Sequence, residues 1–235
     1  MKAIILAAGV GRRLSPLTET TPKSLISVGG KTILSRMMEA LISAGIKDIC
    51  IVVGYLKEKV EEAAVDFEQI AQISFIVNPD YEKGSILSVW AAKSCINGDI
   101  LLMDSDVLFE RLILEKLIKS GNLNCFLIDK NFKDSGEEMK IAALDGRVVQ
   151  VARRITERYD EIGEGVGFFK LSGKYVKEFL SAFSKVISGN KDCDYENALD
   201  YLVKSASVGF EDVTGMKWTE IDFKEDIEKA EQLGL

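Results

Sequence analysis

The segment LAAGVGRRLSPLTETTPKSL, residues 6–25, places two glycines, two arginines and a lysine directly after an apolar run. A glycine-rich turn after a strand lets backbone N–H groups approach a phosphate chain. Arg12 or Arg13, together with Lys23, would add positive charge to such a site. The alternative is an ordinary glycine turn with solvated basic side chains. A dinucleotide-binding motif and a P-loop are both excluded, because the segment has neither the third glycine of G-x-G-x-x-G nor the G-K-[ST] ending.

The residue types that the chain lacks narrow its chemistry further. It contains no histidine, which excludes imidazole acid–base catalysis, Ser-His-Asp triads and histidine-ligated metals. Catalysis must therefore use carboxylates, Lys, Arg, Ser, Thr or bound cations. We expect no structural zinc and a reducing compartment, because no C-x-x-C pair occurs among the four cysteines, Cys50, Cys95, Cys125 and Cys193.

The composition is typical of one compact globular domain, since 47% of the 235 residues are hydrophobic and 29% are charged. A formal net charge of −7 disfavours binding to nucleic acid or to anionic membranes, although a local basic loop can still hold a small anion. The first apolar run ends at Gly9 and is followed by Arg12 and Arg13. We therefore expect no signal peptide, no membrane span and a cytoplasmic protein, and a homodimer is compatible with the sequence.

Short apolar runs alternate with helical patterns in the first half of the chain. Strands are expected at residues 2–8, 48–54, 73–78 and 99–106, and helices at residues 32–45, 56–67 and 85–95. Runs that are apolar on both faces favour a parallel sheet covered by helices, in a Rossmann-like, doubly wound arrangement. Ligands of such sheets bind at the carboxyl ends of the strands. The glycine loop and the segment MDSDV, residues 103–107, both lie at such ends.

The pattern changes near residue 123, where strands become more frequent. Strands are expected at residues 124–130, 139–153 and 164–173, and helices at residues 174–187 and 195–206. No linker rich in Pro, Gly or Ser separates the two halves. We therefore predict a single domain over residues 1–235, of the α/β class, with a mixed and mainly parallel sheet.

Beyond the isolated glycine turn, the whole opening segment carries a long motif. MKAIILAAGVGRRLSPLTETTPKSLISVGGKTIL resembles the signature of the nucleotidyltransferase family that includes the nucleoside-diphosphate-sugar pyrophosphorylases, in the form L-A-A-G-x-G-x-R-L-x-P-L-T, then P-K-x-L and V-x-G-K. Later segments look more like the phosphocholine cytidylyltransferase branch, among them NPDYEKGSILSVWAAK, LLMDSDVLF, GEGVGFFKLSG and KWTEIDFKEDIEKA. The resemblance implies a GT-A-like nucleotidyltransferase fold, with a nucleotide-binding part at about residues 1–122 and an acceptor-binding part at about residues 123–235.

The resemblance implies a cytidylyltransferase that joins CTP to a phosphorylated small alcohol or aminoalcohol with release of pyrophosphate. Phosphocholine-like compounds, aminoethylphosphonate and inositol phosphate are the expected acceptors, and Mg²⁺ is the expected cofactor. One alternative is a sugar-1-phosphate nucleotidylyltransferase that uses UTP, dTTP or GTP. An alternative of another class is a non-catalytic, nucleotide-sensing regulatory subunit. Such a subunit could have lost any of the four key residues, all of which this chain keeps: Arg13, Lys23, Asp106 and Asp222.

The same resemblance assigns roles at the nucleotide end. Arg13 would neutralise the leaving pyrophosphate, and Lys23 would hold the attacking phosphate or the α-phosphate; a solvated surface lysine is the alternative for Lys23. Asp106 and Asp222 would bind Mg²⁺. Asp104 competes for the metal role, unless it forms an Asx turn or bonds the loop backbone, and Asp222 could instead cap the helix that follows it. The implied nucleotide-binding residues are Leu6, Ala7, Ala8, Gly9, Gly11, Gly84, Ser85 and Ser88, of which Ser85 could simply be a helix cap.

The implied acceptor-binding residues lie mostly in the second half. Carboxylates there would favour a cationic or polyol acceptor, unless they are solvated surface acids, and an aromatic side chain could contact a quaternary ammonium by a cation–π interaction. The residues are Glu138, Arg153, Glu164, Glu196 and Trp218. The chain departs from the family at one point, since related enzymes usually carry a lysine where Arg153 and Arg154 follow VVQVA. Arginine offers a planar fork in place of a point charge, so the acceptor geometry should differ.

Overall fold

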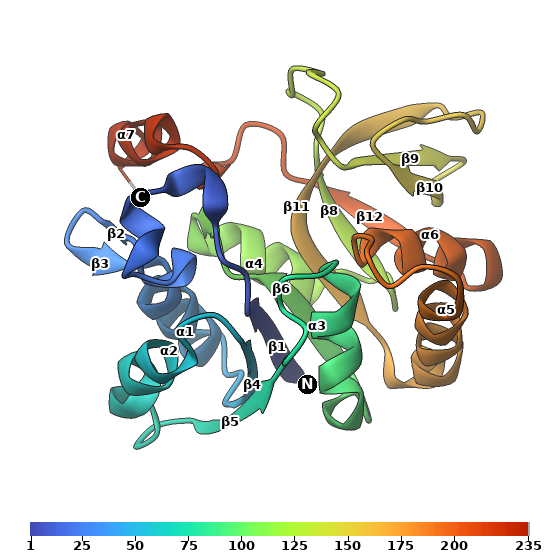
Figure 1. Cartoon of the computed structure of the whole chain (residues 1–235). Coiled ribbons are helices and arrows are strands. Elements are labelled where there is room, and N and C mark those ends of the chain that lie inside the picture. The colour runs from blue at the N-terminus through green and yellow to red at the C-terminus, as the bar shows by residue number, and fades with distance from the viewer. Residues whose placement is uncertain (235) are drawn as a thin grey trace.

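The computed structural model describes residues 1–234, and its centre is a nine-stranded mixed sheet (Figure 1). The strands of this sheet are β1 (Lys2–Ala7), β4 (Asp48–Val53), β5 (Gln72–Val77), β6 (Ile100–Asp104), β8 (Cys125–Asp129), β9 (Lys140–Leu144), β10 (Arg147–Ala152), β11 (Glu161–Leu171) and β12 (Gly209–Asp212). Their order is β10-β9-β11-β6-β1-β4-β5, and β8 pairs with both β11 and β12.

The two halves of the sheet differ in strand direction. In the first half β1 pairs in parallel with both β4 and β6, and β4 pairs in parallel with β5. In the second half β11 runs antiparallel to β6, β8 and β9. The long strand β11 therefore joins the halves into one sheet, and the predicted α/β fold with a mixed sheet is confirmed.

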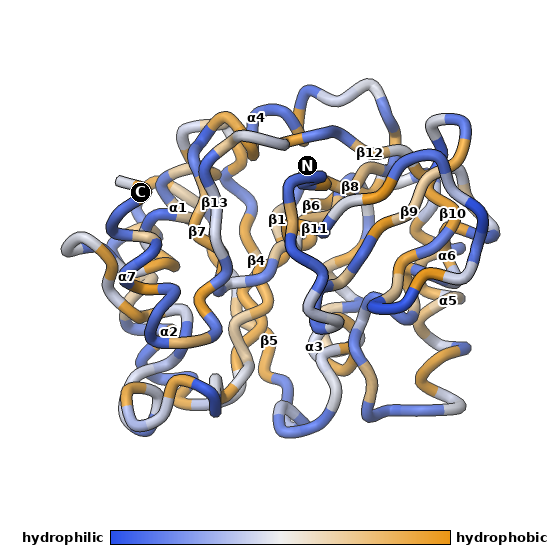
Figure 2. The backbone as a smooth tube through the Cα atoms, turned by 90° about the horizontal axis from the view of Figure 1, so that it is seen from above, coloured by the Kyte–Doolittle hydropathy of each residue, from blue (hydrophilic) through white to orange (hydrophobic). Residues whose placement is uncertain are grey.

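Helices cover both faces of the sheet, because the central strands are apolar on both sides. On β1, Ile4 packs into one hydrophobic core, while Ala3 and Ile5 pack into the opposite one. Figure 2 shows this as hydrophobic colouring along the central strands. The helices are α1 (Ile33–Ser43), α2 (Lys57–Ala64), α3 (Ile86–Ala91), α4 (Arg111–Lys119), α5 (Val176–Gly189), α6 (Glu196–Ser205) and α7 (Lys224–Leu233).

Some elements differ from the sequence-based expectation. The helices predicted at 56–67 and 85–95 are shorter, because each ends in a 3-10 turn, namely η4 (Val65–Phe67) and η5 (Ala92–Cys95). The sequence analysis did not predict α4 or two small sheets, which pair β2 (Ser27–Val28) with β3 (Lys31–Thr32) and β7 (Val107–Phe109) with β13 (Trp218–Glu220). Within residues 1–234, no helix is both long enough and apolar enough to cross a membrane.

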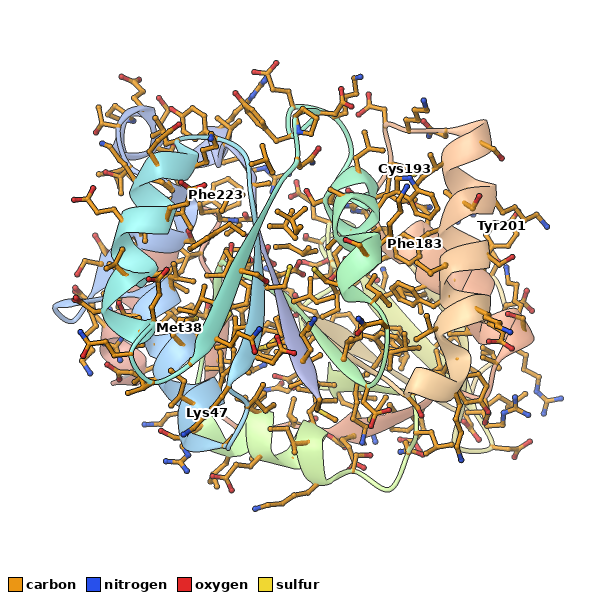
Figure 3. All side chains as sticks on the ribbon, turned by 90° about the horizontal axis from the view of Figure 1, so that it is seen from below. Met38, Lys47, Phe183, Cys193, Tyr201 and Phe223 are labelled. Carbon is orange, nitrogen blue, oxygen red and sulfur yellow. The ribbon has the colours of Figure 1, made fainter. Side chains whose placement is uncertain are left out.

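The start of α3 touches the chain just before α6, so the first and second halves also meet away from the sheet. The Ile86 backbone N–H donates to the Cys193 carbonyl at 3.3 Å. A Cβ atom on Gly84 would lie 2.2 Å from that carbonyl oxygen and 2.3 Å from the Cys193 nitrogen. Figure 3 shows Cys193 beside α3, with Phe183 buried nearby and Tyr201 farther out. Glycine at position 84 thus has a packing reason that is independent of any nucleotide.

Replacing Gly84 with alanine should therefore destabilise the protein. Because the clashing atoms are backbone atoms, the expected loss in free energy of unfolding is about 1–3 kcal/mol, measured by urea denaturation. Gly121→Ala is the matched control, since a Cβ there meets nothing within 4 Å, and its effect should stay within about 0.5 kcal/mol. Equal stabilities of the two variants would contradict the close contact at Gly84.

Candidate active site

A small hydrophobic cluster anchors the basic loop that follows β1. The loop contains the 3-10 helices η1 (Arg12–Leu14), η2 (Leu17–Glu19) and η3 (Lys23–Leu25). Leu14 is fully buried in a cluster with Ile26, Leu108 and Ile221. Leu108 belongs to β7 and Ile221 follows β13, so this cluster brings the loop against the acids of both segments. Figure 1 shows α7, which also contributes to the cluster, beside the loop that follows β1.

Gly11 allows the loop to turn tightly over Lys23. Its φ of +67° lies in the left-handed region, which favours glycine. A Cβ atom at this position would also lie 3.2 Å from Lys23 Cβ. The Thr18 hydroxyl donates to the Gly11 carbonyl at 2.9 Å and closes the turn. The loop therefore holds the stem of Lys23 in a defined direction.

Lys23 forms the central ion pairs of the site. Its Nζ lies 2.6 Å from Asp106 Oδ2 and 2.6 Å from Asp222 Oδ1. Burial lowers the pKa of Lys23, but the charges of Asp106 and Asp222 outweigh burial and raise the pKa above its ordinary value. The side chain of Lys23 is only 14% exposed. The alternative of a solvated surface lysine is therefore wrong.

Backbone pairing holds the two aspartates opposite each other. Asp106 lies in the turn between β6 and β7, and its carbonyl accepts a hydrogen bond from the Ile221 N–H at 3.0 Å. Glu220 pairs with Val107 across the small sheet of β7 and β13. The backbone N–H of Asp222 donates to Asp226 Oδ2 at 2.9 Å, and α7 begins only at Lys224. The helix-cap alternative for Asp222 is therefore wrong.

The donor set fits a divalent cation. Carboxylate oxygens of Asp106, Glu220 and Asp222 lie within 4.8 Å of one another. Asp106 Oδ1 is buried and has no hydrogen-bond partner among the described residues. Burial, followed by the charges of Asp106 and Asp222, raises the pKa of Glu220 to about 8. Crowded oxygen ligands with excess negative charge are what a hard cation such as Mg²⁺ prefers.

Arg13 contacts this cluster from its outer side. Its Nη1 lies 3.1 Å from Asp222 Oδ2 and 3.2 Å from Glu137 Oε2, and its guanidinium stacks over the Phe223 ring. The side chain is 53% exposed, so it is much freer to move than Lys23. Arg12 instead makes an exposed pair with Glu82 at 3.7 Å. Of the two arginines, only Arg13 therefore reaches the acid cluster.

A cavity of about 950 Å³ connects the acid cluster with the second half of the chain. Nine of the predicted site residues line it: Arg13, Ser85, Asp106, Glu138, Arg153, Glu164, Glu196, Trp218 and Asp222. The predicted metal-binding aspartates and all the predicted acceptor-binding residues therefore line the same cavity. The remaining predicted residues lie outside this lining: Leu6, Ala7, Ala8, Gly9, Gly11, Lys23, Gly84 and Ser88. Their roles toward a nucleotide stay predictions.

Two of the serines have protein partners. The Ser88 hydroxyl is buried and accepts a hydrogen bond from Asn78 Nδ2 at 3.0 Å. Ser85 stands at the start of α3, but its side chain does not cap that helix. Instead, Ser85 Oγ accepts a hydrogen bond from the Tyr195 N–H at 3.0 Å. The helix-cap interpretation of the Ser85 side chain is therefore wrong.

Asp104 lies outside the acid cluster of Asp106, Glu220 and Asp222 and binds Tyr195 instead. Its Oδ2 accepts a hydrogen bond from Tyr195 Oη at 2.8 Å, and Asp104 is not among the three acids within 4.8 Å. A Cβ atom on Gly167, whose φ is +79°, would lie 2.7 Å from Asp104 Oδ2. Burial, followed by the charge of Asp106, raises the pKa of Asp104 well above its ordinary value. The Asx-turn alternative for Asp104 is wrong, because its carboxylate binds the buried Tyr195.

Charged pairs shape the acceptor side of the cavity. Arg153 Nη1 lies 2.5 Å from Asp194 Oδ2, and its Nε donates to the Glu137 carbonyl at 3.1 Å. The pKa of Glu196 is raised to about 7, mainly by burial and also by the charge of Asp194, while a backbone hydrogen bond and the charge of Arg153 oppose the rise. Burial also raises the pKa of Glu164.

Two predicted acceptor residues already have protein partners. The Trp218 indole N–H donates to Asp129 Oδ2 at 2.9 Å, so one edge of the ring is fixed. Glu138 accepts hydrogen bonds from the Ser135 hydroxyl at 2.6 Å and from the Ser135 N–H at 2.8 Å. The Ser135 hydroxyl is the main cause that lowers the pKa of Glu138 to about 2. Glu138 thus closes its own turn, and its contact with an acceptor stays a prediction.

Several polar residues of this cavity were not predicted from the sequence, among them Asp129, Glu137 and Asp194. Asp129 ends β8, so the rule that ligands bind at strand ends could have identified it. Glu137 pairs with Arg13 across the cavity. Glu137 directly precedes the predicted Glu138, but its pairing with Arg13 could not be read from the sequence, because the two residues are 124 positions apart.

Comparisons with known proteins agree on one family. A family model described as Nucleotidyl transferase matches residues 2–125. A bifunctional IPC transferase and DIPP synthase of Aquifex aeolicus is 30% identical over 98% of this chain, and a CTP:phosphoglutamine cytidylyltransferase of Campylobacter jejuni is 28% identical over 97% of this chain and 98% of its own length. The chain spans about half the length of the bifunctional relative, 51%.

A solved structure is similar over the whole chain. The CTP:phosphocholine cytidylyltransferase of Streptococcus pneumoniae superimposes with a TM-score of 0.80 and 26% identity, covering 100% of this chain and 99% of the other. The nucleotidyltransferase fold that the sequence resemblance implied is thus confirmed.

The raised pKa of Glu196 predicts a pH-dependent stability. The folded protein holds the proton up to about pH 7, whereas the unfolded chain releases it near the ordinary value of 4.5. Between these values the folded state binds more protons, so the free energy of unfolding should fall as the pH rises. Glu196→Gln removes this contribution, and its melting temperature should fall less than that of the parent between about pH 5 and pH 8.

The control for this comparison is Glu62→Gln, which changes an exposed glutamate on α2. All melting curves are recorded with a chelator, so that no metal contributes. Parallel pH profiles for the parent and Glu196→Gln would show that Glu196 is solvated.

Proposed function

Because the chain belongs to the nucleotidyl transferase family, we propose that it is a cytidylyltransferase that joins CTP to a small phosphorylated acceptor and releases pyrophosphate. The acceptor is a phosphorylated alcohol or aminoalcohol, such as a phosphocholine-like compound, aminoethylphosphonate or inositol phosphate. The names of the relatives and of the similar structure support this choice of nucleotide and of acceptor class.

The observation that carries the proposal is the meeting of two cations and two acids beside the cavity, which Arg13, Asp106 and Asp222 line. Lys23 contacts both Asp106 and Asp222, and Arg13 contacts Asp222. In the proposed reaction a phosphate or phosphonate oxygen of the acceptor attacks the α-phosphorus of CTP, and pyrophosphate leaves. Such a displacement depends on charge neutralisation and in-line positioning, which a protein without histidine can supply.

Each of these residues has a distinct part in the proposal. Lys23 holds the α-phosphate or the attacking phosphate, because its loop fixes its stem. Arg13 is more exposed and neutralises the pyrophosphate as it leaves. Asp106 and Asp222 hold Mg²⁺, with Glu220 beside them. When bound, Mg²⁺ supplies neutralisation of the negative charge on the triphosphate.

The lining of the cavity favours an acceptor that carries positive charge. Four cationic side chains line it, Arg13, Lys133, Arg153 and Lys229. Acidic side chains line it in larger number, even without Asp104, Glu196 and Glu220, whose pKa values are raised. The eleven acids are Asp104, Asp106, Asp129, Glu137, Glu138, Glu164, Asp194, Glu196, Glu220, Asp222 and Asp226. This excess of acids attracts a cationic head group and disfavours an acceptor whose only charge is its phosphate. An aminoalcohol phosphate or an aminophosphonate therefore suits the cavity better than a hexose phosphate does.

An activity panel tests the proposed reaction. The purified protein, with Mg²⁺, is offered each of four nucleoside triphosphates with phosphocholine, phosphoethanolamine, aminoethylphosphonate, inositol phosphate or glucose 1-phosphate. Pyrophosphate release should require CTP and should be fastest with an acceptor that carries an amine. Turnover of hexose phosphates with UTP or dTTP alone would show a sugar nucleotidylyltransferase, and no turnover with any pair would support a nucleotide-sensing subunit.

Substitutions test the residue roles. Lys23→Ala should lower turnover about 10²-fold or more, because charge stabilisation in the transition state is lost. Asp106→Ala should abolish activity at every Mg²⁺ concentration. Lys31→Ala is the control, since Lys31 makes only an exposed pair with Glu39. Full turnover by the Lys23 variant would refute its role, and full turnover by the Asp106 variant would move the metal role to other acids.

A further inference from the structure

Positively charged side chains already occupy the oxygens that would bind the metal. Asp106 Oδ2 and Asp222 Oδ1 both accept hydrogen bonds from Lys23, and Asp222 Oδ2 accepts one from Arg13. The remaining oxygen, Asp106 Oδ1, is buried. A divalent cation that binds both aspartates therefore competes with Lys23 and Arg13 for these oxygens.

Lys23 is the stronger of the two competitors. It bridges both aspartates and is 14% exposed, whereas Arg13 contacts only Asp222 in this pair and is 53% exposed. Mg²⁺ binds oxygen at about 2.1 Å. If it shared two oxygens with an ammonium that lies 2.6 Å from each, the two cations would be less than about 5 Å apart and would repel each other strongly. The ammonium and the metal ion therefore compete for the same two carboxylates.

The ammonium also has a way to leave. Lysine has three N–H donors, and two of them bind the aspartates. Within residues 1–234, no acceptor is recorded for the third. A phosphate oxygen can bind this free donor first and then take over the ammonium, because a charged phosphate replaces the partners that the ammonium loses.

We propose that Lys23 is a resident cation that keeps divalent metal out of the free protein, and that a bound triphosphate withdraws it so that Mg²⁺ can bind Asp106 and Asp222. This inference rests on the proposed function. Its consequence is that triphosphate and metal bind cooperatively: each raises the affinity for the other, because both favour the arrangement in which Lys23 has left the acids. By linkage the two effects are equal in free energy.

Metal binding to the free protein tests the exchange without any turnover. Mn²⁺ binding is measured by electron paramagnetic resonance, with no nucleotide, on the parent, Lys23→Gln and Lys23→Met. Both variants should bind Mn²⁺ about tenfold more tightly than the parent, within the 5–150-fold range usual for coupled sites. Mn²⁺ should also raise the melting temperature of the variants more than that of the parent. Two variants are made so that the test can be carried out even if only one of them folds, which circular dichroism verifies.

Two controls assign the gain to this position. Lys31→Gln removes a surface lysine of the same charge and should bind Mn²⁺ like the parent. Adding Asp106→Asn to Lys23→Gln should remove the gained affinity. A second measurement follows binding of α,β-methylene CTP, which should be strengthened by Mg²⁺ much more in the parent than in Lys23→Gln.

The outcomes separate this inference from the proposed function. If the parent binds Mn²⁺ as tightly as both variants, the exchange is overturned, while the metal site and the reaction stand. If no form binds Mn²⁺ without nucleotide, the exchange is also overturned. If pyrophosphate release proves independent of divalent metal, the proposed metal role of Asp106 and Asp222 fails first, and the inference falls with it.

Discussion

The ammonium of Lys23, shared between Asp106 and Asp222, is the interaction on which the site depends. Two carboxylates so close together repel each other, and an intervening cation makes their proximity favourable. The hydrophobic cluster around Leu14 and Ile221 supplies the scaffold, because it packs the first loop against the segments that carry both acids. Removing the cation would leave two partly buried negative charges close together, which is more destabilising than loss of a fully exposed pair.

Much of the fold was predictable because the responsible signals are local. Strand β1 and its parallel neighbours are short apolar runs, and α1, α5 and α6 carry clear helical periodicity. Apart from the nine-residue helix α4, the elements that escaped prediction are short strands. Strands β7 and β13 have three residues each, and each exists only because the other pairs with it. Periodicity cannot reveal three residues, so tertiary pairing had to be seen in the structure.

The candidate site shows the same division. Lys23, Asp106 and Asp222 came from a motif resemblance, and the structure brings Lys23 within hydrogen-bond distance of both aspartates. Their charge state did not follow from sequence, because the raised pKa of Glu220 arises from acids that burial collects. Nor did the sequence predict that Asp104 binds Tyr195, because Tyr195 lies 91 positions later in the chain. Contacts of this kind depend on how the helices pack over the ends of the strands, which the local sequence does not reveal.

The short strand β13 has a consequence for how the protein is made. Asp222 follows this strand and lies 116 positions after Asp106, so a ribosome that adds 5–20 residues per second needs roughly 6–23 s to travel between them. During that interval β1, β4, β5 and β6 have already been synthesised, while the charged centre still lacks Asp222. A chain that terminates before β13 therefore lacks one of the two aspartates that Lys23 binds, and the centre can be completed only after β13 has been synthesised and has paired with β7.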